Sequence, residues 1–177
     1  FVFKFNIMEF RKAVYSDVDE IVEIVKGGQE RLRAQGIDQW QRGYPNRGSI
    51  EADVAAEVGM VLCDGGRVAA YGAVIFTGEP AYEAISGGGW LTDGPYAVVH
   101  RLCVAADFLR GGCGVEFMRR VERLARGRVP SVRIDTHPDN AVMQRLVKRM
   151  GFVYCGDVVI ESRRLAYEKI LPAPMAE

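Results

Sequence analysis

A glycine-rich turn between an apolar run and an amphipathic stretch constrains the fold of this chain more than any other feature. Residues 98–104 are mostly apolar and partly β-branched, which is typical of a buried strand. Residues 109–114 contain three glycines, and residues 115–121 repeat apolar side chains at helical spacing. A strand, a tight turn and a helix in this order direct backbone N–H groups and the helix N-terminus at one point. We therefore expect a site for phosphate or pyrophosphate at this turn.

Alternating strand and helix patterns along the rest of the chain predict one mixed α/β domain around a single sheet. Strands are expected at residues 9–14, 60–63, 67–76, 96–104, 132–135, 152–160 and 163–170. Helices are expected from residue 18 to a break at Gly27-Gly28, over 29–34, from a Ser49 cap to 58, from the glycine turn to 126, and over 140–150. Gly65-Gly66 between two of the strands predicts a tight hairpin.

The chain has 177 residues, which fits a single domain with a full hydrophobic core. We assign residues 8–171 to that domain, residues 1–7 to possible upstream sequence before Met8, and residues 172–177 to a C-terminal tail. Two long irregular segments, 36–48 and 77–95, carry large aromatic side chains. We expect at least one of these to line a pocket for an acceptor molecule: Trp40, Tyr44, Tyr82 and Trp90.

Charge and cysteine content exclude several classes of protein. Acidic and basic residues balance at 23 each, so bulk charge gives no argument for nucleic acid or a membrane surface as a partner. The four cysteines form no CxxC pair and there are only two histidines, so we predict no metal site. Widely spaced cysteines in apolar runs are typical of reduced, buried thiols, which favours the cytoplasm.

Two common nucleotide-binding signatures do not fit the glycine turn. The G-x-G-x-x-G spacing of a dinucleotide-binding domain is absent, and no acidic residue follows at the required distance. No Gly-Lys-Ser/Thr follows the turn either, which excludes a P-loop. The remaining interpretation is a short turn that suits a single pyrophosphate.

The turn and its preceding strand resemble the GNAT superfamily of acyl-CoA-dependent N-acyltransferases. The family's pyrophosphate loop reads Gln/Arg-x-x-Gly-x-Gly/Ala, and residues 109–114 take its positions, with Gly112 and Gly114 matching. Leu109 departs from the Gln or Arg of the family, and Arg110 follows one place later.

A second block downstream is similar to the same family. Asn140 matches an Asn that contacts the pantetheine arm, and Leu146 and Gly151-Phe152 follow in the family's order. Val147 stands where the family often has a Tyr that protonates the departing thiolate. Tyr154, Tyr96, Tyr82 or solvent could take that role. A further block, Gln39-Trp40 with Tyr44-Pro45, resembles a subgroup of bacterial members whose substrates are mostly unassigned.

The resemblance implies a mixed, mainly antiparallel central sheet flanked by helices. It implies acetyl-CoA as co-substrate, no metal, and direct attack of a primary amine on the thioester. The backbone of Leu102, Cys103 and Val104 would pair with pantetheine as an added strand would. The pyrophosphate loop would consist of Leu109, Arg110, Gly111, Gly112, Cys113, Gly114 and Val115, with Asn140 on the pantetheine arm. A small-molecule amine is the expected acceptor, a homodimer is possible, and neither nucleic acid nor a membrane is expected.

His100 is the candidate general base. A strand period of two predicts His100, Leu102 and Val104 on one face, and this family position often carries Glu or His facing the substrate. The alternative is a hydrogen-bonded core histidine. Cys103 is a candidate nucleophile, but its apolar surroundings favour a structural thiol. Four arginines of the following helix are expected to form a solvated face, unless one reaches the 3′-phosphate of CoA: Arg119, Arg120, Arg123 and Arg126.

Two other functions fit the same motifs. A non-catalytic, regulatory acyl-CoA-binding module would explain Val147 and Leu109. A protein N-terminal or lysine acetyltransferase would have an open acceptor groove, whereas a closed aromatic pocket would favour a small amine.

Overall fold

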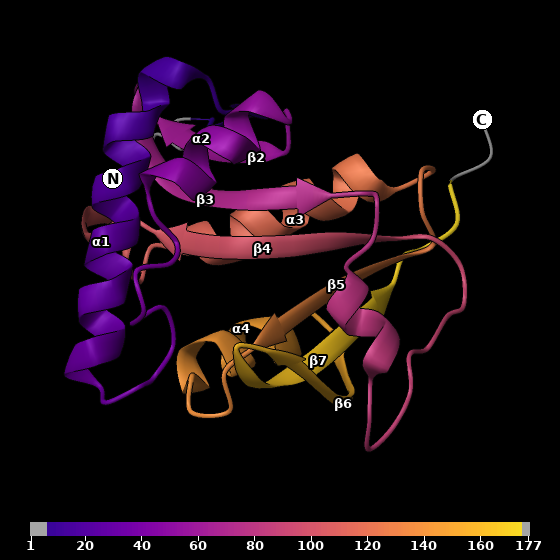
Figure 1. Cartoon of the computed structure of the whole chain (residues 1–177). Helices are drawn as coiled ribbons and strands as arrows, with labels where there is room; N and C mark the ends of the chain where they lie inside the picture. Colours follow the sequence, from indigo (N-terminus) through magenta and orange to yellow (C-terminus); the bar gives the residue numbers. More distant parts are fainter. Residues whose placement is uncertain (1–6, 175–177) are drawn as a thin grey trace.

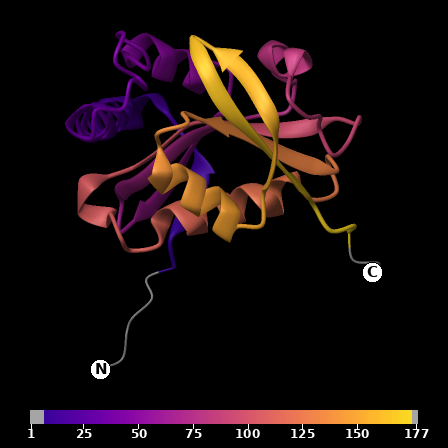
Figure 2. The same cartoon turned by 90° about the horizontal axis from the view of Figure 1, so that it is seen from below.

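A seven-stranded sheet with helices on both faces forms the body of the molecule (Figures 1 and 2). The computed structural model describes residues 7–174. The strands are β1 (Glu9–Lys12), β2 (Gly59–Asp64), β3 (Arg67–Ile75), β4 (Tyr96–Val104), β5 (Ser131–Thr136), β6 (Val153–Ile160) and β7 (Ser162–Ile170). The helices are α1 (Val18–Ala34), α2 (Arg47–Ala55), α3 (Cys113–Ala125) and α4 (Ala141–Arg149), with 3-10 turns η1 (Tyr15–Asp17), η2 (Pro80–Ala84) and η3 (Ala106–Phe108).

The strand order is β1-β2-β3-β4-β5-β7-β6, and among the strands of residues 7–174 only β4 and β5 pair in parallel. The main core lies between the sheet and α3, with a contribution from α4, and contains Phe117, Met118 and Val121. A second core lies on the opposite face under α1 and α2, around Ile21 and Ile50. The predicted mixed, mainly antiparallel sheet flanked by helices is confirmed. The hairpin is confirmed as well, because Gly65 and Gly66 both have positive φ between the paired residues of β2 and β3.

The predicted break at Gly27-Gly28 is wrong, because α1 runs through both glycines as one helix. Gly28 is buried against the next layer of the fold. A Cβ at this position would lie 2.6 Å from Sγ of Cys103 and 3.3 Å from the Trp40 ring. The glycine therefore serves close packing of α1 on β4, which outweighs its low helix propensity.

The predicted Ser49 cap is also wrong, because the N-cap of α2 lies three residues earlier. Asn46 is the N-cap: its Oδ1 accepts from the Ser49 backbone N–H at 3.0 Å, and its own N–H donates to the Ser49 hydroxyl at 2.8 Å. Ser49 is thus the third residue of a reciprocal capping box, and the helix ends at Ala55 rather than at residue 58.

Strand β4 contains a bulge that sequence periodicity could not show. Tyr71 and Ala73 of β3 pair with Cys103 and His100 of β4, so β4 has one extra residue there. Arg101 lies at this bulge and adopts a left-handed backbone conformation, with a φ of 58°. The bulge reverses the alternation, so Leu102 and Val104 pack on the α3 face while His100 lies against Tyr82 on the opposite face. The prediction that His100 shares a face with Leu102 and Val104 is therefore wrong.

The irregular segment 77–95 is fastened to the sheet rather than free. Ser86 and Asp157 of β6 exchange backbone hydrogen bonds of 2.8 and 2.9 Å. The carboxylate of the buried Glu168 accepts from the Leu91 N–H at 2.6 Å and from the Thr92 hydroxyl at 2.7 Å. These bonds fix the position of the segment over β5 and β7.

Replacing Gly88 with Ala should destabilise this attachment. A Cβ at Gly88 would lie 2.1 Å from the carbonyl oxygen of Cys155, and backbone on both sides cannot move apart cheaply. We expect the free energy of unfolding to fall by about 2 kcal/mol or more in denaturant titrations. Gly89→Ala is the matched control, because a Cβ there meets nothing within 4 Å. Equal losses in the two variants would contradict the close approach.

Both ends of the chain carry expectations that lie largely outside the described residues. The possible upstream segment 1–7 is described only at Ile7, and the tail 172–177 only to residue 174. Among the described helices, none is long and apolar enough to cross a membrane.

Candidate active site

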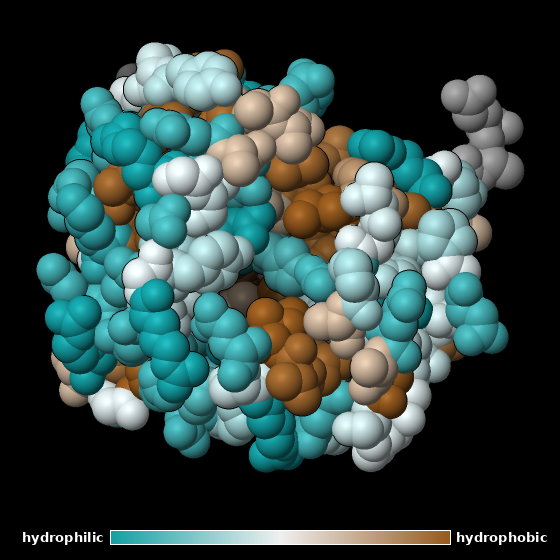
Figure 3. All heavy atoms as spheres, viewed as in Figure 1, coloured by the Kyte–Doolittle hydropathy of each residue, from teal (hydrophilic) through white to brown (hydrophobic). Residues whose placement is uncertain are grey.

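The parting of β4 and β5 opens the centre of the sheet. The two strands pair only through Tyr96–Ser131, Ala97–Val132 and Val98–Arg133, at their beginnings. Beyond these pairs, the second half of β4 keeps its partner β3 but has no partner on the β5 side in the described part of the chain. The molecule is hollowed near the middle of this face, with brown hydrophobic and teal polar side chains around the opening (Figure 3). Unpaired strand backbone here can pair with an extended, amide-containing ligand.

The glycine turn closes one end of this opening. Arg110 and Gly112 both have left-handed backbone conformations, with φ of 65° and 78°. Gly112 is the N-cap of α3 and offers no capping side chain, and the first α-helical bond is from the Glu116 N–H to the Gly112 carbonyl. No hydrogen bond among the described residues uses the N–H groups of residues 112–115. These four donors, with the positive end of the helix dipole, form a strong site for an anion.

Gly114 lets three elements meet beside the turn. A Cβ on it would lie 3.3 Å from Leu146 of α4 and 3.8 Å from Val104 of β4. The Cys113 side chain, by contrast, is buried in the main core, so only its backbone N–H is available at the turn. Leu109 is 44% exposed, so the residue that replaces the family's Gln or Arg presents an apolar side chain to solvent.

One backbone carbonyl of β4 next to the turn already accepts a hydrogen bond from a side chain. The Arg31 guanidinium, from α1, donates to the carbonyl of Val104 at 2.9 Å. A carbonyl oxygen accepts two hydrogen bonds, so a ligand can still use its second lone pair.

Cys103 is a structural thiol in its surroundings. It is 6% exposed, and its Sγ lies 3.4 Å from the carbonyl oxygen of Ile24. Burial raises the pKa of the Cys103 thiol to about 11, against a smaller lowering effect of Arg31. The thiol is therefore protonated near neutrality, which leaves no thiolate for nucleophilic attack.

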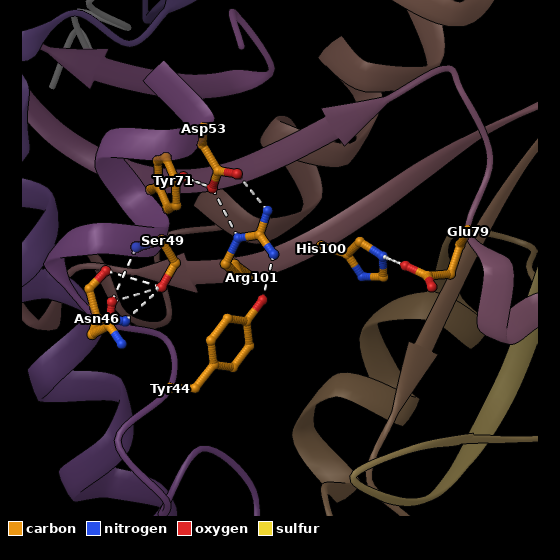
Figure 4. A network of polar contacts seen from close by, with 8 residues as sticks. All are labelled: Tyr44, Asn46, Ser49, Asp53, Tyr71, Glu79, His100 and Arg101. Atoms are coloured by element: carbon orange, nitrogen blue, oxygen red, sulfur yellow. Dashed lines mark hydrogen bonds and ion pairs between the residues drawn. The ribbon is translucent and has the colours of Figure 1, made fainter. Parts of the chain in front are cut away.

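His100 and Glu79 form a hydrogen-bonded pair on the other side of the opening (Figure 4). Nε2 of His100 lies 2.8 Å from Oε2 of Glu79, while the other Glu79 oxygen accepts from the Ala81 N–H and caps η2. Because a carboxylate only accepts, the neutral imidazole carries its proton on Nε2 and has its lone pair on Nδ1. The same pairing logic orients a catalytic histidine in many enzymes.

Asp135 and Tyr82 complete the surroundings of His100. Nδ1 of His100 lies 3.9 Å from Oδ2 of Asp135, and the same oxygen accepts from the Tyr82 hydroxyl at 2.7 Å. Tyr82 is fully buried, and burial followed by the charge of Asp135 raises its pKa well above the usual value. Tyr82 thus holds Asp135 in place but is not itself exposed to a ligand. Among the expected aromatic residues, Trp90 packs on Tyr82 and Trp40 on the second core.

A second polar cluster lies beside His100 along β4 (Figure 4). Arg101 forms two hydrogen bonds to the Asp53 carboxylate, of 2.8 and 2.5 Å, and a third to the Tyr44 hydroxyl at 2.5 Å. Tyr71 donates to the same carboxylate. Burial lowers the pKa of Arg101, but the bonds to Asp53 outweigh it and raise the pKa overall. The charge of Arg101 is therefore neutralised, and the bulged residue is tied to α2 and to the segment before it.

Asn140 and Val147 occupy different surroundings. Oδ1 of Asn140 caps α4 by accepting from the Met143 N–H, and Nδ2 donates to Oε1 of Gln39 at 3.0 Å. Val147 is 1% exposed in the main core. A pantetheine contact of Asn140 stays a prediction, and Gln39 is an additional polar group beside it.

Sequence reasoning missed Glu79, Asp135 and Arg101. Glu79 precedes Pro80 directly, which is a helix-start signal, but nothing in the sequence pairs it with His100. Asp135 is the second-last residue of the buried strand β5, and a carboxylate at that place is the one signal that could have singled it out. Arg101 reaches Asp53 and Tyr44 at a bulge that the sequence does not show. Among the described residues, no group of three or more His, Cys, Asp or Glu is placed to hold a metal ion.

Comparison with known proteins identifies the fold and the family. The profile of the Acetyltransferase (GNAT) family matches residues 26–152. The chain belongs to the GNAT family. It is therefore an acetyltransferase enzyme. A search of curated proteins found no match to this chain.

Solved GNAT structures resemble the chain over nearly its whole length. A GNAT family acetyltransferase from Streptococcus agalactiae is 34% identical, with a TM-score of 0.89 over 93% of this chain and 96% of that one. A GNAT family acetyltransferase from Listeria monocytogenes is 20% identical, with a TM-score of 0.73 over 93% and 95%. The Salmonella typhimurium protein yncA, solved with its cofactor acetyl-CoA, is 18% identical, with a TM-score of 0.63 over 97% and 98%. The latter two show a shared fold.

Proposed function

We propose that this GNAT enzyme transfers the acetyl group of acetyl-CoA to a small primary amine by direct attack. The observation that carries the proposal is the placement of four free N–H groups at the start of α3, at one end of the opening between β4 and β5. His100, with Glu79 behind it, lies beside the same opening. The N–H groups can hold a pyrophosphate, and His100 can accept a proton.

The cofactor would be held mainly by backbone. The N–H groups of residues 112–115 would bind the pyrophosphate, with Leu109, Arg110 and Gly111 shaping the turn. The free edge of β4 at residues 102–104 would pair with the pantetheine amides. Leu109 removes a polar side chain that other family members use, so binding rests on these amides and the helix dipole.

The proton path follows from the tautomer of His100. The ammonium form of the acceptor gives one proton to Nδ1 of His100, directly or through one water, and the imidazolium that forms is stabilised by Glu79 and Asp135. The neutral nitrogen bonds to the thioester carbonyl carbon, the carbon–sulfur bond breaks, and the electron pair leaves on the CoA sulfur. The nitrogen loses its second proton as the sulfur gains one, and His100 releases its proton to solvent.

Charge around His100 favours a cationic acceptor. The two nearest carboxylates, Glu79 and Asp135, face the imidazole from either side. Arg101, the nearest cation along β4, is neutralised by Asp53. A positively charged amine is attracted to this point, whereas a carboxylate would be repelled.

Gly112→Val should weaken acetyl-CoA binding. A β-branched residue at φ 78° strains the turn and places two methyl groups beside the N–H donors. We expect the KM for acetyl-CoA to rise about tenfold or more. Gly127→Val is the matched control, because Gly127 has φ 75° at the other end of α3 and should lose similar stability without a change in KM. Unchanged KM in Gly112→Val would contradict the proposed site.

A panel of small amines and peptide N-termini, assayed for thiol release and acetylated product, tests the reaction itself. We expect turnover with small cationic primary amines and no acetylated protein when acetyl-CoA is supplied alone, because Cys103 is buried and protonated. Turnover restricted to peptides would favour the protein-modifying alternative. An acetyl-enzyme at Cys103 would contradict direct attack.

The state of the cysteines favours a reducing compartment. All four described cysteines are free and buried, with no disulfide between them. Free thiols persist in a reducing environment, so we place the enzyme in the cytoplasm.

A further inference from the structure

Five cationic side chains surround a hollow at the C-terminal ends of α3 and α4, away from the proposed cofactor site. The hollow has a volume of about 420 Å³. Besides Met150, its lining residues are all charged: Arg119, Glu122, Arg123, Arg126, Arg149 and Lys169. Arg126 lies fourteen residues beyond Gly112, so at about 1.5 Å per residue it is about 20 Å from the glycine turn along the helix. The hollow begins at Arg119, at the middle of α3, so a CoA pyrophosphate at the turn and a ligand in the hollow would lie along different halves of the helix.

The positive charge of the hollow is largely uncompensated. Glu122, the one carboxylate, is bound by Lys169 at 2.6 Å. Within residues 7–174, the four guanidinium groups form no hydrogen bond or ion pair. Arg120, on the same helix, instead pairs with Glu116 at 2.7 Å. Five cations against one carboxylate give a local net charge of four in a chain whose overall net charge is zero.

The partial negative charges at the helix C-termini offset only part of this positive charge. Basic residues near a helix C-terminus offset its partial negative charge, which is about half an elementary charge for each helix. Two helices end here, so they balance about one of the four positive charges. About three remain, which is more than stabilisation of α3 and α4 requires.

We propose that this hollow binds a small anion that carries two or more phosphate groups, at a site separate from the acetyl-CoA cleft. Arginine suits such a ligand because its planar guanidinium binds phosphate oxygens in pairs. The volume falls within the range of small-molecule sites. The cations converge on one concave place rather than forming a long stripe, which fits a compact anion better than a nucleic-acid strand.

Calorimetric titration with inorganic tripolyphosphate tests this inference, with the enzyme saturated with CoA so that the cleft is filled. We expect saturable binding that weakens as salt is raised. The double variant Arg123→Gln/Arg149→Gln should raise the Kd at least about tenfold, since each loses charge-assisted hydrogen bonds. Its KM for acetyl-CoA should stay unchanged. Arg145→Gln, one turn earlier on α4 and outside the hollow, is the control and should bind as the unmodified enzyme does.

Four results would overturn the proposal. One is an absence of saturable binding, and another is an equal Kd in the double variant. The third is binding that appears only in a parallel titration without CoA, which would assign the anion to the cofactor cleft. Tighter binding of a single-stranded oligonucleotide than of tripolyphosphate, abolished in the double variant, would assign the face to nucleic acid and also overturn it. None of these outcomes depends on acetyl transfer, so the proposed reaction is tested separately.

Discussion

His100→Gln is expected to lower kcat for acetyl transfer by about 10²- to 10⁴-fold, the range for loss of a general base. Glutamine keeps a donor near Glu79 but cannot accept the proton of the amine. The KM for acetyl-CoA should change little, because the cofactor site rests on backbone N–H groups at the other end of the opening. Steady-state kinetics of the two enzymes measure both constants.

Glu79→Gln separates catalysis by His100 from simple packing. It keeps the hydrogen bond to Nε2 but removes the charge that stabilises the imidazolium, so we expect a smaller loss of kcat, about tenfold. Glu83→Gln, an exposed residue of the same 3-10 turn, is the control. If His100→Gln retained full kcat while Glu79→Gln did not, His100 would be a packing residue and the base would lie elsewhere.

Glu168→Leu is expected to destabilise the fold by about 3–5 kcal/mol, the cost of leaving a buried charge without its partner. Glu168 is fully buried and accepts from Arg133 at 3.0 Å, from Ser131 at 2.6 Å and from Thr92 at 2.7 Å. Arg133, itself 5% exposed, would lose its only ion pair among the described residues. Segment 77–95 would lose one of its attachments at the same time and keep the Ser86–Asp157 backbone bonds, so kcat should fall as Glu79 becomes less well positioned.

Denaturant titration measures this loss, and an exposed pair gives the scale. Lys12 and Glu57 are 58% and 73% exposed, so Lys12→Gln should change the free energy of unfolding by less than about 1 kcal/mol. A Glu168→Leu variant as stable as Lys12→Gln would contradict the assigned network.

The same carboxylate predicts a pH dependence of stability. Burial raises the pKa of Glu168, but the bonds from Ser131, Thr92 and Arg133 outweigh it and hold the pKa below its ordinary value. A lowered pKa in the folded state contributes stability above the unfolded value, about 4.3, and loses it as the pH falls through the folded value. Unfolding free energies should therefore drop below about pH 4.3, and less steeply in Glu168→Gln.

Local signals in the sequence predicted most of the fold. Residues 98–121 predicted the strand, turn and helix that the structure contains, because periodicity and glycine placement act over a few residues. The helix break predicted at Gly27-Gly28 was wrong because the burial of Gly28 against Cys103 depends on a strand far along the chain. The face predicted for His100 was wrong for a similar reason, since only the pairing of β4 with β3 shows the extra residue at the Arg101 bulge. Buried pairs such as Arg133 and Glu168 join distant segments and leave no pattern in the sequence.

The candidate site divides in the same way. The backbone donors at residues 112–115 were predicted, because a glycine turn followed by a helix is enough to create them. His100 was predicted by position in the family, yet its partner Glu79 and the carboxylate of Asp135 were not. Their roles arise from the folding of segment 77–95 over the sheet, which no local signal describes.

A crystal structure of the enzyme with acetyl-CoA tests the central claim most directly. We predict pyrophosphate oxygens within about 3.2 Å of the backbone nitrogens of residues 112–115, pantetheine between β4 and β5, and the thioester beside His100. A cofactor whose pyrophosphate lies in the arginine-lined hollow, with the N–H groups of residues 112–115 left free, would contradict it.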